Sequence, residues 1–307
     1  MKARAPKNRT LTLTDEDRQR LAGGLLRLQE PATADALDGR VVHADLLEVI
    51  DFLPDAFVDL LILDPPYNLD KDFGASRFAH RTNDAYLQYL ESWFPRLLRL
   101  LKPQATVYLC GDWQCSAAEY QVMAKYLRVQ NRITWQREKG RGAKANWKNC
   151  CEDIWFGTVG EKYFFDVEAV KQKRRVIAPY LENGRPKGWQ KTDAGNYRLT
   201  CPSNFWDDIS VPYWSMRENT DHPTQKPEKL LAKLILASSR PGDFVFDPFL
   251  GSGTTAVVAK KLGRRFCGVE LNQEYCCWAL KRLENADEDP AIQGYRDGVF
   301  WERNSQK

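Results

Sequence analysis

Residues 244–256 read FVFDPFLGSGTTA, and this stretch decides the fold class. Its apolar start is followed at once by Asp247 and Pro248, then by a turn with Gly251 and Gly253, and then by a helix-like run. A short, continuous apolar run that ends in a turn signal is typical of a buried parallel strand. Because glycine lets the backbone turn sharply and approach a ligand closely, the stretch predicts a strand, a ligand-binding turn and a helix.

Similar apolar runs lie on both sides of this unit, each followed closely by an acidic residue. They cover residues 41–42, 58–63, 106–109 and 266–269. Helix-like stretches lie between the runs, at residues 84–101, 116–127, 227–239 and 272–285. The alternation predicts an α/β fold with a doubly wound, mostly parallel sheet. Pro95 is expected to kink or split the first of these helices.

Composition excludes several classes of protein. The chain has 307 residues, of which 43% are hydrophobic, enough for a folded core. Its apolar runs are far shorter than the roughly 18 residues of a membrane helix, and residues 1–19 lack the apolar segment of a secretory signal. Eight cysteines without a C-x-x-C pair, beside only three histidines, predict reduced thiols in a cytoplasmic protein and no metal site.

Charge is mild overall and concentrated locally. The net charge is +4, but residues 136–200 hold 14 lysines and arginines against 8 acidic residues. Such a segment suits contacts with phosphates, although a solvated surface has the same composition.

The loop after residues 58–63 reads DPPYN, residues 64–68. It follows a predicted strand and therefore lies at the carboxyl edge of the sheet, where open α/β sheets bind ligands. Pro65 and Pro66 lack N–H groups, so the loop presents carbonyl oxygens. Together with the Asp64 carboxylate and the Tyr67 ring, these oxygens suit a planar ring that bears an amine. The simpler alternative is a tight turn with a capping acid and a packing tyrosine.

Two further features complete the candidate site. Residues 221–227, DHPTQKP, precede a helix, and Thr224, Gln225 and Lys226 at its start are suited to hold a carboxylate. Glu270 ends the last predicted strand, where an acid is able to bind two ribose hydroxyls. Taken alone, the glycine turn with a following acid also fits a dinucleotide-dependent oxidoreductase.

In their order along the chain, residues 64–68, 222–227 and 247–255 resemble the motifs of a known family. This family is the β-group of S-adenosylmethionine-dependent DNA amino-methyltransferases, which act on N6 of adenine or N4 of cytosine. The resemblance covers roughly residues 40–285, with supporting matches at residues 43–45, 101–103 and 152–156. It implies a Rossmann-like methyltransferase sheet with a circularly permuted motif order and an inserted target-recognition region.

The resemblance also implies a role for each motif. A target base is flipped out of the duplex, because the chemistry cannot reach it in the stack. Tyr67 would stack on the base, while Asp64 and the carbonyl of Pro65, in the loop that includes Pro66, would accept hydrogen bonds from its amine. The residues expected around S-adenosylmethionine are Ala44, Asp45, Asp64, Thr224, Lys226, Asp247, Pro248, Phe249, Gly251, Ser252, Gly253, Thr254, Glu270 and Leu271.

The residues that would surround the methionine part of the cofactor are Asp247, Phe249, Gly251 and Gly253. Glu270 would bind the ribose, Asp45 would meet the adenine amine of the cofactor, and Lys226 would lie near the carboxylate. No metal is expected.

Five segments follow from this interpretation. They are an N-terminal extension with one helix (1–40), a catalytic half (41–135), a target-recognition insertion (136–220), a cofactor-binding half (221–285) and a C-terminal tail (286–307). The helix of the extension is expected to start at a capping box of Thr14 and Asp17. The densest basic run, expected to bind DNA, is Arg137, Lys139, Arg141, Lys144 and Lys148.

The predicted function is site-specific methylation of adenine N6 in double-stranded DNA. Asp64 favours adenine, because the family usually has serine at that position for cytosine N4, which stays the alternative. A DNA-binding protein with an inactive site is a third interpretation, against which the intact motifs argue. The chain is expected to form a homodimer and to have a cognate restriction endonuclease as a partner. No contact with a membrane is expected.

Overall fold

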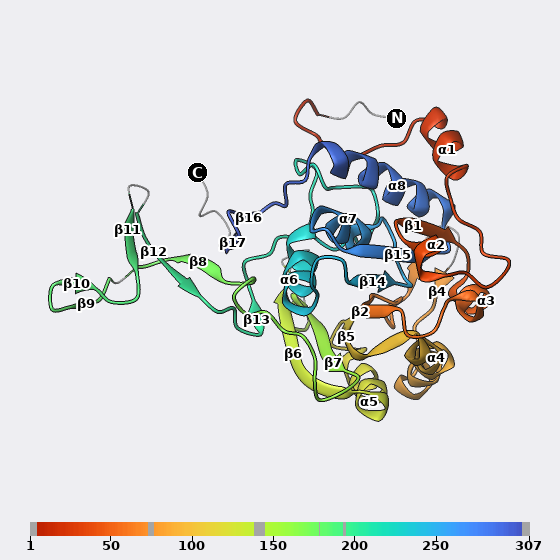
Figure 1. Ribbon diagram of the computed structural model, residues 1–307, viewed down its shortest axis with the longest axis horizontal. Coiled ribbons are helices and arrows are strands. Elements are labelled where there is room, and N and C mark those ends of the chain that lie inside the picture. The colour runs from red at the N-terminus through yellow and green to blue at the C-terminus, as the bar shows by residue number, and fades with distance from the viewer. Residues whose placement is uncertain (1–4, 73–76, 138–144, 178, 193–194, 303–307) are drawn as a thin grey trace.

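A computed structural model describes residues 5–72, 77–137, 145–177, 179–192 and 195–302. An eight-stranded sheet with the order β1-β15-β14-β2-β5-β7-β6-β13 forms its centre (Figure 1). The first five strands in this order, β1, β15, β14, β2 and β5, run parallel. Strand β7 pairs antiparallel with β5 and β6. The bounds are β1 (Arg40–His43), β15 (Arg265–Glu270), β14 (Phe244–Asp247), β2 (Val58–Leu63), β5 (Leu101–Gly111), β7 (Cys151–Thr158), β6 (Arg128–Gln136) and β13 (Phe205–Trp206).

Helices cover both faces of this sheet. One face packs against α6 (Glu228–Ser238), α7 (Thr254–Lys261) and α8 (Gln273–Glu288), and the other against α3 (Leu46–Val49), α4 (Asn83–Leu97) and α5 (Ser116–Tyr126). In β2, Leu60 and Ile62 join the first core, whereas Leu61 and Leu63 join the second. A strand buried on both faces needs apolar residues at every position, which explains the continuous apolar runs. The predicted doubly wound α/β fold is confirmed.

Shorter elements connect these layers. They are α1 (Asp15–Ala22), α2 (Ala34–Leu37), η1 (Ile50–Phe52), η2 (Leu98–Leu100), and the two-stranded pair β3 (Lys71–Asp72) and β4 (Arg77–Phe78). The capping box predicted before α1 is present, because Asp17 N donates to Thr14 Oγ1 at 3.0 Å and Thr14 N donates to Asp17 Oδ2 at 3.2 Å. No helix in the described part of the chain is long and apolar enough to cross a membrane.

Of the two effects expected of Pro95, a kink or a split, the structure excludes the split of α4. Pro95 lies in the last turn of the helix, which ends at Leu97 and tightens into the 3-10 turn η2. A proline disturbs the carbonyl four residues before it, so its effect is small when the helix ends directly afterwards.

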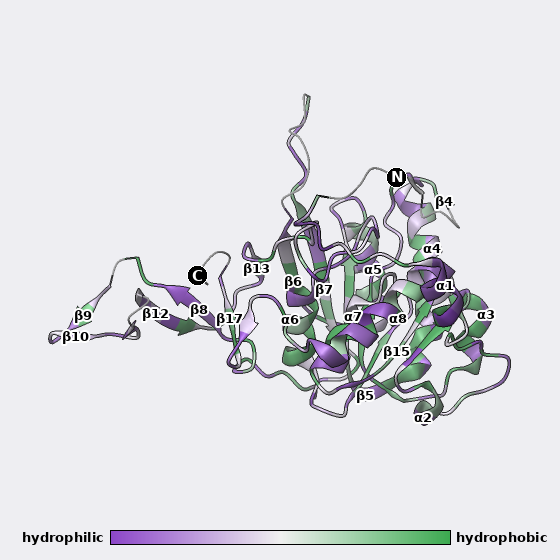
Figure 2. Cartoon of the chain, turned by 90° about the horizontal axis from the view of Figure 1, so that it is seen from above, coloured by the Kyte–Doolittle hydropathy of each residue, from purple (hydrophilic) through white to green (hydrophobic). Residues whose placement is uncertain are grey.

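A second sheet forms an arm that extends away from the main body (Figure 1). Its order is β11-β12-β8-β17-β16, and the pair β9–β10 lies at its far end. Figure 2 shows hydrophobic residues gathered in the main body, whereas β8 in the arm is hydrophilic. The bounds are β8 (Gln172–Arg175), β9 (Leu181–Glu182), β10 (Arg185–Pro186), β11 (Gln190–Thr192), β12 (Gly195–Thr200), β16 (Tyr295–Arg296) and β17 (Val299–Trp301).

Three of the predicted segments make contacts that the sequence did not predict. The segment 136–220 is not wholly an insertion, because β7 and β13 within it belong to the central sheet. The segment 286–307 is not simply a tail, since β17 pairs with β8 and Phe300 is fully buried. The segment 1–40 contributes to a core, because Leu13 and Leu21 pack with Cys277 and Trp278 of α8. Each difference is a contact between residues far apart in sequence, which local patterns do not encode.

Candidate active site

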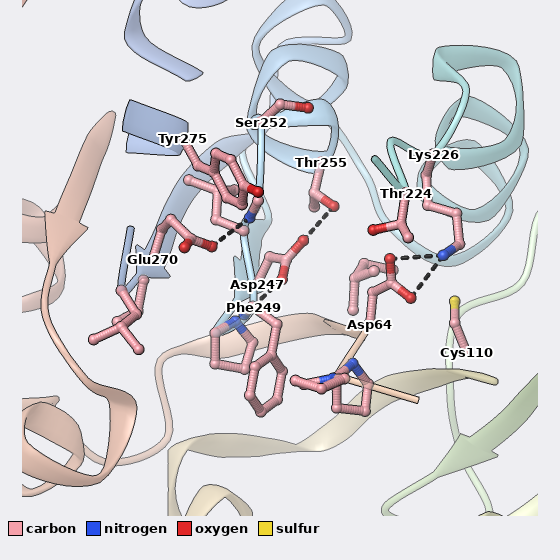
Figure 3. Close-up of a pocket in the computed structure, with 18 of the residues that line it drawn as sticks. Asp64, Cys110, Thr224, Lys226, Asp247, Phe249, Ser252, Thr255, Glu270 and Tyr275 are labelled. Carbon is pink, nitrogen blue, oxygen red and sulfur yellow. Dashed lines mark hydrogen bonds and ion pairs between the residues drawn. The ribbon is translucent and has the colours of Figure 1, made fainter. Parts of the chain in front are cut away.

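One cavity of about 400 Å³ lies at the carboxyl ends of the parallel strands (Figure 3). Since β14 pairs with both β15 and β2, the turn after β14 and the loop after β2 emerge next to each other. Asp247 from the turn and Asp64 from the loop line the same cavity. The expectation that these two distant motifs meet at neighbouring strand ends is confirmed.

Asp247 fastens the glycine turn to the helix that follows it. Its Oδ1 accepts from Phe249 N at 3.0 Å, and its Oδ2 accepts from Thr255 Oγ1 at 2.6 Å (Figure 3). The side chain is buried, and this burial raises the pKa of Asp247 to about 7. The carboxyl therefore holds the turn rigid at the floor of the cavity.

Glu270 lies across the same turn, at the end of β15. Its Oε2 accepts from Gly251 N at 2.8 Å (Figure 3). Its Oε1 accepts from Asn272 N at 2.7 Å. Burial raises the pKa of Glu270 above its usual value. Gly251 has a φ of 55°, in the left-handed region that favours glycine. The two backbone donors orient the carboxylate toward the cavity that it lines.

Gly253 has a packing role that the sequence did not predict. It lies outside the cavity wall, with a φ of 84°, and a Cβ placed there would stand 2.5 Å from Cβ of Ala279 on α8. The contact of Gly253 with the cofactor stays a prediction. The glycine is needed because α7 and α8 approach each other too closely for any side chain at this point.

A further part of the cavity wall is largely apolar. Ala44 and Asp45 follow β1, Leu271 follows β15, and Phe249 from the turn packs edge-on against Trp93 of α4 with ring centroids 4.9 Å apart. The carboxylate of Asp45 caps α3 by accepting from Leu47 N at 2.8 Å. The remaining predicted cofactor residues also line the cavity, namely Thr224, Lys226, Pro248, Ser252 and Thr254.

The loop after β2 carries the most strongly coupled charges. Lys226 Nζ donates to both carboxylate oxygens of Asp64 at 2.7 Å (Figure 3). It also donates to the Tyr67 hydroxyl at 3.0 Å. Burial raises the pKa of Asp64, and the ammonium of Lys226 opposes that rise. Burial would lower the pKa of Lys226, but the carboxylates of Asp64 and Glu152 outweigh it and the net shift is upward. The two side chains thus lie at ion-pair distance, and the charge of each favours the charged form of the other.

The rest of this loop is held by the protein. Asn68 is fully buried, accepts from Arg81 N at 2.7 Å and donates to Arg81 O at 2.8 Å. The carbonyl of Pro66 accepts from the Tyr86 hydroxyl at 3.2 Å. Pro65 is buried in the cavity wall. These contacts fix the loop from below, so that Asp64 and Tyr67 have defined positions.

Sequence reasoning gave no role to Glu152 and predicted Arg137 only as a contact with DNA. Glu152 on β7 is buried, lines the cavity, and accepts from the Tyr67 hydroxyl at 3.1 Å. Arg137 pairs with the other oxygen of Glu152 and lines the cavity as well. The sequence signal for Glu152 was its place in the supporting match at residues 152–156, which gave it no role.

Other cavity residues left no signal in the sequence. Trp93, Cys110 and Tyr275 belong to elements that the motifs do not include. Among the predicted DNA-binding residues, Lys148 is exposed, whereas Lys139, Arg141 and Lys144 lie outside the described residues.

The charges of the cavity wall fit S-adenosylmethionine. Five acidic side chains and two basic ones, Arg137 and Lys226, line it. Such an excess of negative charge suits a ligand that carries a sulfonium and an ammonium. The acids are Asp45, Asp64, Glu152, Asp247 and Glu270.

Comparison with known proteins gives consistent relatives. The model of the N6/N4 methyltransferase family, described as DNA methylase, matches residues 58–281. The chain is 33% identical over 252 residues to the type II methyltransferase M.HpaI of Haemophilus parainfluenzae, which covers 81% of this chain and 75% of that protein. It is 35% identical over 254 residues to the DNA adenine methyltransferase YhdJ of Escherichia coli. This match covers 80% of this chain and 83% of that protein.

Solved structures share the architecture. M1.HpyAVI in complex with SAM is 26% identical, with a TM-score of 0.53, and the match covers 79% of this chain and 98% of that one. The cytosine-N4-specific PvuII DNA methyltransferase shares the fold, with 17% identity and a TM-score of 0.59. The match covers 82% of this chain and 87% of that one. From the family match across most of the chain and the two relatives above 30% identity, it follows that this chain belongs to the N6/N4 DNA methylase family.

Proposed function

We propose that this chain is a site-specific DNA methyltransferase, which transfers a methyl group from S-adenosylmethionine to the N6 amine of adenine in duplex DNA. The observation that carries the proposal is the meeting of the Asp64 loop and the Asp247 turn at one cavity. An acceptor for an amine and a turn for a cofactor thus lie side by side, as a direct transfer between two bound molecules requires.

S-adenosylmethionine supplies an electrophilic methyl group when it is bound. The residues that would hold it come from three strand ends. Glu270 would accept hydrogen bonds from the ribose hydroxyls, and Asp45 would accept from the adenine amine of the cofactor. Phe249 and Leu271 would cover the apolar surface of its purine ring, and Asp247 and Gly251 would lie along its methionine part.

Asp64 is the residue that would activate the target amine. The lone pair of an aromatic amine is delocalised into the ring, which makes the nitrogen a poor nucleophile. Asp64 and the carbonyl of Pro65 would accept hydrogen bonds from the two N–H groups of the amine. The nitrogen then moves toward tetrahedral geometry, and its lone pair becomes available. The Asp64 carboxylate would then stabilise the positive charge that develops on this nitrogen, and the methylated nitrogen would lose that charge by releasing one proton to water.

Tyr67 would hold the target base in place. Its ring lines the cavity beside Asp64, and its hydroxyl is fixed by Lys226 and Glu152. A base that has left the duplex loses its stacking neighbours, and an aromatic side chain replaces part of that energy. We therefore assign the stacking role to Tyr67.

Two observations favour adenine over cytosine N4. The catalytic loop begins with Asp64, and the family usually has serine at this position for cytosine. The relative at 35% identity is named as a DNA adenine methyltransferase.

The arm is the part of the chain to which we assign most of the contacts with DNA. Arg175, Arg185, Lys191 and Arg198 on its strands are exposed to solvent. Phosphate contacts fix the position of a protein on the duplex, while arginines that reach guanine edges read the sequence. The loop between β6 and β7, with Lys148, is the second region that we assign to DNA.

Further partners belong to the proposal as well. The resemblance to the β-group favours a homodimer, which light scattering after gel filtration tests. The name of M.HpaI as a type II methyltransferase favours a cognate restriction endonuclease encoded beside this chain. We place the protein in the cytoplasm with its DNA substrate.

The direct test is methylation of duplex DNA by the purified protein. The protein is incubated with S-adenosylmethionine and genomic DNA without modified bases, and the hydrolysed nucleosides are measured by mass spectrometry. We expect N6-methyladenine at one short recurrent sequence. The matched control is Asp64→Ala, which is expected to bind S-adenosylmethionine but to produce no methylated base. N4-methylcytosine in place of N6-methyladenine would contradict the assignment of the base, and the absence of both would contradict the activity.

A further inference from the structure

The ion pair of Lys226 and Asp64 has a consequence for the reaction. Lys226 Nζ lies 2.7 Å from each carboxylate oxygen of Asp64, so the ammonium uses the acceptors that a target amine also needs. The positive charge of the lysine also lies close to the place where positive charge develops on the target nitrogen. A site that works must therefore weaken this pair as the base binds.

Glu152 is the second anion within reach of the same ammonium. Its Oε2 lies 3.4 Å from Lys226 Nζ, and it approaches from β7 while Asp64 follows β2. The side chains are well enclosed, with exposed fractions of 3% for Glu152 and 9% for Lys226. At such burial a lysine requires a carboxylate partner at all times, because an uncompensated charge is costly. Glu152 therefore gives Lys226 a partner that does not depend on Asp64.

The neighbouring charges favour the ionised form of Glu152, which this role requires. Burial would raise its pKa, but the charges of Lys226 and Arg137 outweigh that effect and hold the pKa below its usual value. Arg137 pairs with the Oε1 oxygen, which leaves Oε2 toward Lys226 and the Tyr67 hydroxyl. The carboxylate is thus ionised, oriented and shared between the two groups that flank the expected target base.

We propose that Glu152 is a positioning residue for methyl transfer, which takes over the ammonium of Lys226 so that Asp64 can accept from the target amine. The proposal rests on the function proposed above. In the same position Glu152 accepts from the Tyr67 hydroxyl and fixes the orientation of the stacking ring. Glu152 acts through Lys226 and Tyr67 and does not itself touch the reacting atoms.

The test compares the isosteric variant Glu152→Gln with the parent in single-turnover methylation of duplex DNA. The single-turnover rate isolates the chemical step from product release. We expect this rate to fall by about 10- to 100-fold, less than for the loss of a group at the reacting atoms. The affinity for S-adenosylmethionine is expected to stay unchanged, because Glu270 and Asp45 lie at the other end of the site.

The control variant is Asp153→Asn, on the same strand. Asp153 accepts from Ser116 Oγ and Thr134 Oγ1 at 2.9 Å each, so asparagine keeps acceptor capacity there. The single-turnover rate of Asp153→Asn should equal that of the parent. The thermal midpoints of both variants show whether a loss of rate comes from a loss of folded protein.

A double variant separates positioning from a merely structural role. If Glu152 acts by taking over the ammonium, Glu152→Gln slows the reaction little further once Lys226→Met has removed that ammonium. Effects that multiply in the double variant would overturn the proposal, as would a Glu152→Gln rate equal to that of the parent. If Glu152→Gln does not fold, Glu152→Asp keeps the charge and should retain more of the parental rate than Glu152→Ala. An inactive parent would instead overturn the function itself.

Discussion

At the scale of single residues, we expect Glu270 to contribute to the affinity for the cofactor. Replacing Glu270 by alanine removes an acceptor for two hydroxyls and also the partner of Gly251 N. A hydrogen bond to a charged group contributes about 1.5–3 kcal/mol, so we expect the dissociation constant for S-adenosylmethionine to rise by about 10- to 100-fold. Titration calorimetry measures this change. Glu274→Ala is the control, because this residue at the start of α8 pairs with Arg18 on the surface. Equal affinity of Glu270→Ala and the parent would refute the assignment.

Asp247 makes stability depend on pH. Burial raises its pKa from 3.8 to about 7, so between these values the folded protein keeps a proton that the unfolded chain has released. Stability therefore falls as the pH rises from about 4 to about 7, by up to about 4 kcal/mol from this group. Asp247→Asn has no such proton, and its stability relative to the parent should increase over that range.

Urea unfolding at pH 5 and pH 8 measures the difference. The control is Asp287→Asn on α8, whose side chain is 65% exposed and lies largely in water. Identical pH profiles of the parent and Asp247→Asn would show that the buried carboxyl is not the source.

At the scale of elements, the packing of α7 against α8 depends on Gly253. A Cβ at this position would meet Ala279 Cβ at 2.5 Å, and the φ of 84° is unfavourable for alanine. Gly242 is a matched control, because its φ is 85° and a Cβ at that position would have nothing within 4 Å. Gly242→Ala isolates the backbone cost of about 1 kcal/mol, and Gly253→Ala should cost roughly 1–3 kcal/mol more through overpacking.

Thermal and urea unfolding of the two variants test this difference. Equal destabilisation would mean that α8 moves aside without cost. If the difference is found, the same variant is also expected to weaken cofactor binding, because the turn before α7 carries Gly251 and Ser252.

At the scale of the whole molecule, the arm should determine how the protein binds duplex DNA. Arg185 and Arg198 are exposed on its strands, whereas Arg240 lies before β14, at the edge of the sheet opposite the cavity. For Arg185→Ala and Arg198→Ala we expect weaker binding, with a salt slope reduced by about 1 for each lost phosphate contact. A variant that loses a guanine contact should instead relax the preference at one base pair, at a cost of about 1–3 kcal/mol.

Fluorescence titrations at two salt concentrations and methylation of a library of duplex sites separate the two cases. Arg240→Ala should match the parent in both measurements. Unchanged affinity and an unchanged site in both arm variants would place recognition elsewhere, with Lys148 beside β7 as the next candidate.

The sequence by itself determined the features that depend on neighbouring residues. Continuous apolar runs predicted the five parallel strands, and the capping box of Thr14 and Asp17 predicted α1. The Asp64 loop and the Asp247 turn were assigned to the carboxyl edge of the sheet, because turn chemistry and strand direction are local properties.

Only the tertiary structure decided which distant residues share an environment. It paired Lys226 with Asp64 and Glu152, placed Gly253 against Ala279, and brought β17 from the C-terminal segment beside β8 in the arm. None of these contacts follows from a local pattern, because each joins residues that are adjacent only after the chain has folded. The free energy of a buried charge or a close helix contact depends on what surrounds it, and folding alone supplies those surroundings.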